Sequence, residues 1–144
     1  MELEDKEKMS YLIEEYSPEK GREGRITLSI YKIIKKQIDE LKFDRESYNS
    51  FIKRMLDYYS KFYATDFLPN NSEEFTYLKN SKKDILKLEF TSVAISPTSK
   101  ARIRALCRTD MSIHSFLDKL LVLMKRDKKY FEDLLDEQNR WMEH

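Results

Sequence analysis

Residues 25–59 read RITLSIYKIIKKQIDELKFDRESYNSFIKRMLDYY, and this stretch decides the fold. At its start Ile26, Leu28 and Ile30 alternate with polar side chains, and this strict period of two predicts a half-buried β-strand. The apolar residues then recur at the spacing of an amphipathic helix. Ser47 is a good N-cap residue and begins a second amphipathic stretch. The sequence therefore predicts a strand, a helix, a short turn and a capped helix, in that order.

The same pattern returns 65 residues later, without a gap, as FTSVAISPTSKARIRALCRTDMSIHSFLDKLLVLM at residues 90–124. In this register Leu28 aligns with Val93, and Ser47 aligns with Ser112. Few residues are identical, but the core-type positions keep their apolar class, and both copies contain the signature S-x-x-S-F followed by an apolar residue. The strand pattern, the turn length and the cap coincide in one register, which predicts a tandem repeat.

The order of strand, helix and capped helix resembles the ribbon-helix-helix family of DNA-binding proteins. The resemblance implies that two units pair their strands into one antiparallel ribbon. We therefore expect a mainly α fold with a two-stranded antiparallel β-ribbon, built as a tandem ribbon-helix-helix pseudo-dimer plus terminal helices. The linker is long enough for one chain to pair its own two strands. Exchange of strands between two chains would bury the same surfaces and is the alternative.

Charge divides the chain into five segments. They are an acidic N-terminal segment at 1–21 with net charge −4, a first unit at 22–62 with +4, a linker at 63–89 with −1, a second unit at 90–126 with +5, and a C-terminal amphipathic helix at 127–144 with −3. Basic units between acidic ends favour phosphate binding, because each neutralised phosphate releases counterions. Solvation of helix faces accounts for many of these charges individually, but not for their segregation.

The outward-facing strand residues are the candidates for reading DNA bases. The resemblance implies that the ribbon lies in the major groove, where Arg can bind guanine and Ser or Thr can hydrogen-bond to base edges. The expected base contacts are Arg25, Thr27, Ser29, Phe90, Ser92 and Ala94. The second strand has no Arg, although Phe and Ala can pack on thymine methyl groups. An ordinary solvated edge strand is the alternative for all six residues.

The N-termini of the two capped helices are the candidates for binding phosphates. Free backbone N–H groups and the positive end of the helix dipole attract an anion there. The expected phosphate contacts are Arg45, Ser47, Tyr48, Asn49, Ser50, Ser112, Ile113, His114 and Ser115. A third serine cap, Ser96 before Pro97, is expected to start the first helix of the second unit. A helix cap without any ligand is the alternative at each N-terminus.

Both ends of the chain carry apolar stripes whose role is open. Met9, Leu12, Ile13 and Tyr16 predict a short N-terminal helix that packs on the core or serves as an interaction arm. After Met124 the helix continues or bends, and a second stripe follows that includes Trp141. That stripe covers the core or forms a contact between protomers, which makes a homo-oligomer through the terminal helices possible.

Several functional classes lack any signal. No glycine-rich phosphate loop, paired histidines or nucleophile–base pattern is visible, so we expect neither an enzyme nor a cofactor. The one cysteine, Cys107, has no partner at metal-ligand spacing, and His114 reads as a polar first-turn residue, so no metal site is expected. No apolar run could span a membrane and no signal peptide is visible, which favours a cytoplasmic protein without membrane partners.

The resemblance implies a sequence-specific double-stranded DNA-binding transcription regulator. The chain resembles the extended regulators of archaeal filamentous viruses in its length, its tandem arrangement and its composition, which is rich in Lys, Glu, Tyr and Ile. This resemblance would place the protein in the host cytoplasm. Two alternatives stay open. One is an antitoxin-type DNA-binding protein that also binds a toxin through an acidic end. The other is a non-regulatory helical structural or virion protein.

Overall fold

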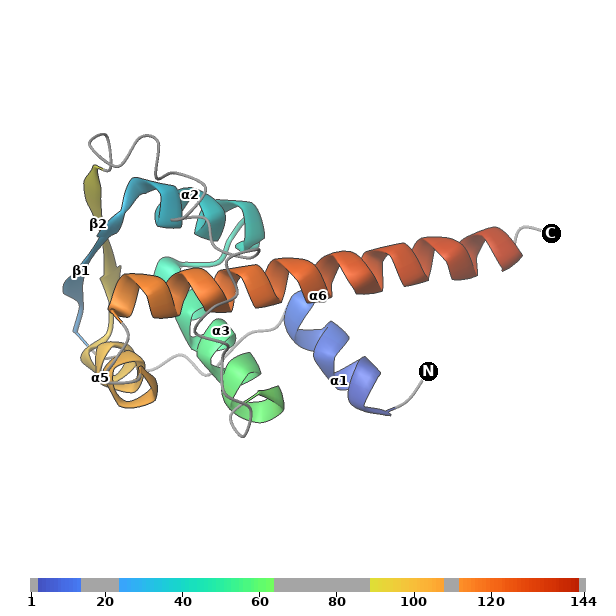
Figure 1. The fold of residues 1–144 in the computed structure, drawn as a ribbon, viewed down its shortest axis with the longest axis horizontal. Helices are drawn as coiled ribbons and strands as arrows, with labels where there is room; N and C mark the ends of the chain where they lie inside the picture. Colours follow the sequence, from blue (N-terminus) through green and yellow to red (C-terminus); the bar gives the residue numbers. More distant parts are fainter. Residues whose placement is uncertain (1–2, 14–23, 64–88, 108–111, 143–144) are drawn as a thin grey trace.

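The computed structural model describes residues 3–13, 24–63, 89–107 and 112–142, and there the chain is mainly helical with one two-stranded sheet. The elements are α1 (Leu3–Leu12), β1 (Ile26–Tyr31), α2 (Lys32–Leu41), α3 (Tyr48–Phe62), β2 (Phe90–Ile95), α5 (Pro97–Leu106) and α6 (Ile113–Met142). Figure 1 shows both strands at one end of the molecule, with α2 and α5 on either side, and α6 running from the strands to the far end. This is the mainly α class with a two-stranded ribbon that the sequence predicts.

The strands β1 and β2 of one chain pair antiparallel with each other. Leu28 lies opposite Val93, and Ile26 lies opposite Ile95. The inner face of this ribbon is closed by Leu28, Ile30, Val93 and Ile95, all of which are buried. The first strand starts at Ile26, one residue later than the alternation predicts, and it extends to Tyr31. Pairing within one chain is therefore sufficient to form the ribbon.

The two halves of the chain contain the same order of elements, and their helices begin at a constant spacing. Helices α2 and α3 begin at Lys32 and Tyr48, and α5 and α6 begin 65 positions later, at Pro97 and Ile113. The strand register has the same symmetry, because Leu28 and Val93 are both direct partners and 65 positions apart. An approximate twofold axis therefore passes through this pair and relates the two halves. The helix starts and the strand register thus follow the 65-residue spacing of the sequence pattern.

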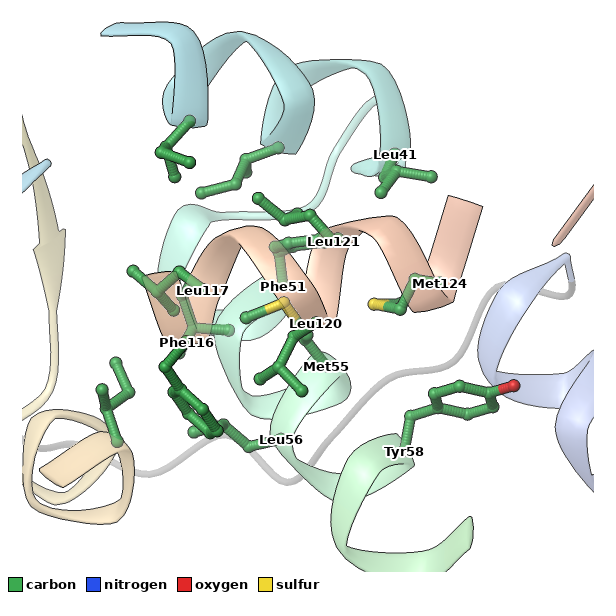
Figure 2. Packing of buried hydrophobic residues seen from close by; sticks show 14 of the residues in the cluster. Leu41, Phe51, Met55, Leu56, Tyr58, Phe116, Leu117, Leu120, Leu121 and Met124 are labelled. Carbon is green, nitrogen blue, oxygen red and sulfur yellow. The ribbon is translucent and has the colours of Figure 1, made fainter. Parts of the chain in front are cut away.

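One hydrophobic core joins the halves, and α3 and α6 supply most of it. Figure 2 shows their large side chains meeting between the two helices, with Leu41 of α2 closing one side. The buried apolar residues of α3 and α6 are Phe51, Ile52, Met55, Leu56, Tyr58, Phe116, Leu117, Leu120, Leu121, Met124 and Phe131. Full burial of one such side chain contributes about 1.5–3 kcal/mol relative to exposure. Neither half could bury these faces alone, so the halves form one folding unit.

Serine caps begin three helices where the sequence predicts them. The Ser47 hydroxyl accepts a hydrogen bond from the Ser50 amide at 3.1 Å, and the Ser96 hydroxyl accepts one from the Ser99 amide at 3.2 Å. Ser112 caps α6 in the same way, with the amide of Ser115 at 3.1 Å. Each cap satisfies one of the backbone N–H groups that a helix leaves without an internal partner.

A buried arginine fixes the loop that leads into α3. The guanidinium of Arg54 bonds both carboxylate oxygens of Glu46 at 2.9 Å and the Leu41 carbonyl at 3.1 Å. It also donates to the carbonyl of Tyr11 and stacks at 4.1 Å on the ring of Phe43. Arg54 thereby joins α1, the end of α2 and α3 around a single side chain.

The N-terminal helix packs on the core, which was one of its two predicted roles. Leu12 is buried, and Met9 and Ile13 pack against the core cluster. Tyr16, the other residue of the predicted stripe, lies outside the described residues. So do residues 64–88, which form nearly all of the predicted linker.

Helix α6 is continuous across the predicted boundary between residues 126 and 127. Asp127 accepts hydrogen bonds from the hydroxyls of Tyr58 and Tyr63 at the end of α3, so it belongs to the same body as the core. Burial raises the pKa of Tyr58, which keeps this hydroxyl a donor. Beyond this anchor Phe131 is still buried, whereas Trp141 is 77% exposed. Of the two predicted courses after Met124, continuation or a bend, the structure shows continuation, and residues 127–142 belong to α6.

Candidate nucleic-acid interface

The outer face of the ribbon is a row of exposed side chains in antiparallel pairs. Thr27 lies opposite Ala94, and Ser29 lies opposite Ser92. All four residues are exposed, as is Arg25 just before β1. The predicted base-contacting residues therefore share one surface, since Phe90 completes the row on β2.

The row continues to Tyr31, which sequence reasoning missed. Tyr31 pairs with Phe90, and their rings stack with centroids 4.6 Å apart. Continuing the alternation of Arg25, Thr27 and Ser29 by one more step would have found it. One end of the outer face is thus aromatic, while the other carries Arg25.

Helix α6 places His114 against this aromatic end. The His114 ring lies 4.4 Å from Tyr31 and 5.8 Å from Phe90, measured between centroids. The Ser29 backbone accepts a hydrogen bond from the imidazole, whereas the buried Nε2 has no hydrogen-bond partner among the described residues. Burial lowers the pKa of His114, and the bond to Ser29 only partly opposes this effect. The imidazole is therefore neutral and packs against the ribbon. Of the groups of His114, the backbone amide is the one suited to bind a phosphate.

Asn49 occupies the equivalent position in the first turn of α3 and makes a different contact. Its Oδ1 accepts hydrogen bonds from the Ser96 amide at 2.8 Å and from the Ser99 hydroxyl at 2.9 Å. The side chain is buried, so it is engaged inside the protein and only its backbone amide is suited to a phosphate. Sequence reasoning did not anticipate this contact, because it joins residues of different halves.

These two contacts place the N-termini of α3 and α6 beside opposite ends of the ribbon. Ser47 and Ser112 are exposed at those N-termini, and Arg45 is exposed in the preceding loop of the first half. Tyr48 donates to Asp39 at 2.7 Å, and this hydrogen bond raises the pKa of the phenol. The remaining predicted phosphate contacts, Ser50, Ile113 and Ser115, are partly buried in the first turns.

Basic side chains lie along the helices on both sides of the ribbon. On α2, Lys36 is exposed, and Lys32 pairs with Glu89 at the end of the ribbon. On α5, Arg104 is exposed, while Arg102 binds Asp57 of α3 at 2.8 Å. The ribbon, the two helix N-termini and these flanking bases form one candidate interface for a polyanion.

A metal site and a membrane-spanning helix are both absent from the described part of the chain. No group of His, Cys, Asp or Glu residues there could hold a metal ion. Cys107 is half-buried at the end of α5. None of the described helices combines the length and the apolar character that a membrane crossing requires.

Comparison with protein-family models, with curated proteins and with solved structures finds no match to this chain.

Proposed function

We propose that this protein is a sequence-specific double-stranded DNA-binding transcription regulator, built from two ribbon-helix-helix units folded as a pseudo-dimer. The observation that carries the proposal is the symmetric ribbon, whose exposed outer row lies between the N-termini of α3 and α6. The major groove admits a two-stranded β-ribbon, and alternate side chains of such a ribbon meet base edges. A polar row with a buried opposite face is suited to that position.

Phosphate contacts would hold the ribbon in its groove. Each helix N-terminus presents backbone N–H groups and a positive dipole end, and the basic side chains of α2 and α5 add charge on both sides. Such contacts set position and affinity but not sequence preference. The logarithm of the affinity for any duplex is therefore expected to fall linearly with the logarithm of the salt concentration.

Sequence preference would come from unlike ends of the ribbon. A symmetric dimer meets the same side chains in both half-sites and reads a palindrome. Here Arg25 lies at one end, and the residue 65 positions later is Phe90. We therefore expect a non-palindromic site, with a guanine opposite Arg25.

The test is selection of binding sites from a randomised duplex library, followed by fluorescence anisotropy. Wild type is expected to select one non-palindromic sequence. Arg25→Ala is expected to lose about 1–3 kcal/mol on that sequence and to relax the choice at one base pair. Lys61→Ala is the control, because Lys61 pairs with Glu7 of α1 and the affinity is expected to change little. Lack of duplex binding, or the same palindrome from wild type and Arg25→Ala, would contradict the proposal.

The distal half of α6 supports an additional contact with a second copy of the chain. Trp141 and Met142 are among the most exposed large apolar residues of the described chain. Contact between copies bound at neighbouring sites would make DNA binding cooperative. Analytical ultracentrifugation of wild type and Trp141→Ala tests this contact. Co-purification of a small foreign protein instead would favour the antitoxin alternative.

A further inference from the structure

The aromatic end of the ribbon consists of Tyr31, Phe90 and His114. Tyr31 stacks on Phe90, with 29° between the ring planes, and His114 lies against both rings. Phe90 is 58% exposed, although Tyr31 and His114 are partly buried. The cluster thus holds one aromatic side chain at the outer surface and supports it from the side with two further rings.

The opposite end of the ribbon has polar residues at all three equivalent positions. The twofold relation pairs Phe90 with Arg25, Tyr31 with Ser96, and His114 with Asn49. Core packing does not require aromatic residues here, since the same backbone is built at the other end with Asn49 hydrogen-bonded to Ser96. The two ends of the ribbon therefore present different side chains at equivalent positions.

We propose that this aromatic end binds the C5-methyl group of a pyrimidine in the major groove, either thymine or 5-methylcytosine. The inference rests on the proposed function, which places the outer face of the ribbon in that groove. The methyl group is the one apolar feature that the major-groove edges of the bases offer. A phenyl ring has no donor or acceptor, so packing it on unmethylated cytosine would desolvate polar atoms without replacing their hydrogen bonds.

The support of the ring strengthens such a contact. A side chain that becomes ordered on binding loses rotamer freedom, which costs affinity. Phe90 is already stacked on Tyr31, and Tyr31 is in turn held by His114, so little freedom is left to lose. Burial of one methyl group against this surface is expected to raise affinity about fourfold.

The experiment compares duplexes that differ by a methyl group alone. Within the sequence that wild type selects, each thymine of the half-site distal to the Arg25 contact is replaced in turn by deoxyuridine. At one of these positions we expect about a fourfold loss of affinity. At that position a duplex with 5-methylcytosine is expected to bind about fourfold better than the same duplex with cytosine. Both comparisons use the unaltered protein, so they do not depend on a variant folding.

Two variants assign the effect to the aromatic end. Phe90→Ser, at an exposed position, is expected to bind the thymine and deoxyuridine duplexes equally. Arg25→Ala, at the equivalent position of the other end, is expected to keep the fourfold preference for the methyl group, although its overall affinity for the duplex is lower. Equal binding of all methylated and unmethylated pairs by wild type, with site selection intact, would overturn this inference and leave the proposed function standing. Absence of duplex binding would overturn both.

Discussion

The two ends of the ribbon have the same backbone and different side chains. Arg25, Ser96 and Asn49 lie at one end, and Phe90, Tyr31 and His114 occupy the equivalent positions at the other. Apolar periodicity and the caps at Ser47 and Ser112 help to set the backbone, and both are repeated at a spacing of 65 residues. The side chains at these six positions are not under that constraint. A duplicated scaffold can therefore keep its symmetry while its two reading surfaces become different.

The two halves also differ inside. Arg54 fixes the loop before α3, whereas the equivalent residue of α6 is Lys119. Helix α3 has 15 residues and α6 has 30, so only the second half extends beyond the shared core. The first half is thus stabilised by the polar network around Arg54. The second half is stabilised by a long helix that packs against α1, α2 and α3.

The largest expected effect comes from removing the buried arginine of the first half. Arg54→Ala leaves the Glu46 carboxylate buried without its partner and removes donors from the Leu41 and Tyr11 carbonyls. Breaking one side of a buried ion pair typically costs about 3–5 kcal/mol, and we expect a loss in that range. Urea unfolding followed by circular dichroism measures it.

The matched control is an exposed ion pair that also involves α3. Lys61 of α3 lies 3.2 Å from Glu7 of α1, and both side chains are more than 40% exposed. Lys61→Ala is expected to cost less than about 1 kcal/mol, because solvent screens an exposed pair. Equal losses for Lys61→Ala and Arg54→Ala would mean that burial does not set the strength of these contacts.

The next effect compares the first turns of α3 and α6. Asn49→Ala removes the acceptor of two buried donors, the Ser96 amide and the Ser99 hydroxyl, and is expected to cost on the order of 2 kcal/mol. His114→Ala removes ring contacts at the solvent-exposed end of the ribbon, worth about 1 kcal/mol. Thermal and urea unfolding of both variants check the order. A larger loss for His114→Ala would reverse the roles assigned to the two ends.

Much of the fold follows from local patterns in the sequence. The period of two predicts the inner residues of both strands, the serines predict three caps, and the ungapped repeat predicts that Leu28 and Val93 are equivalent. Most of the candidate interface follows too, because inner and outer residues alternate. Tyr31 was missed only because the alternation was ended one step early.

The remaining features depend on contacts between distant segments. Arg54 and Lys119 occupy equivalent positions, and no local pattern says that the arginine is buried against Glu46. The contact of His114 with Tyr31 joins the two halves, and so does that of Asn49 with Ser96. The continuity of α6 at Asp127 depends on Tyr58 and Tyr63 in the same way. Burial of polar groups is decided by tertiary packing, which composition and periodicity do not encode.

A smaller effect tests whether the first helix N-terminus contributes affinity without sequence preference. Arg45 is exposed just before Ser47, and its replacement by Ala is expected to weaken binding equally on the selected site and on random duplex. The slope of log affinity against log salt is negative, and its magnitude is expected to decrease by about 1, as for the loss of one phosphate contact. Lys61→Ala, on the side of α3 that faces α1, is the control and should leave the slope unchanged. Loss on the selected site alone would assign Arg45 to base recognition instead.

The smallest effect is a pH dependence that only the aromatic end should have. Burial lowers the pKa of His114 below its ordinary value of 6.5, so the unfolded chain takes up the proton first as pH falls. The stability from the neutral ring is therefore complete above about pH 7 and is lost as pH falls through 6.5 toward the folded-state pKa. His114→Asn places the residue of the other end at this position and is expected to flatten the profile. Urea unfolding of both proteins at pH 7.5, 6.5 and 5.5 is a direct test, because the carboxylates and His144 are common to both and cancel in the difference. Parallel profiles would mean that His114 is not protected from protons at the end of the ribbon.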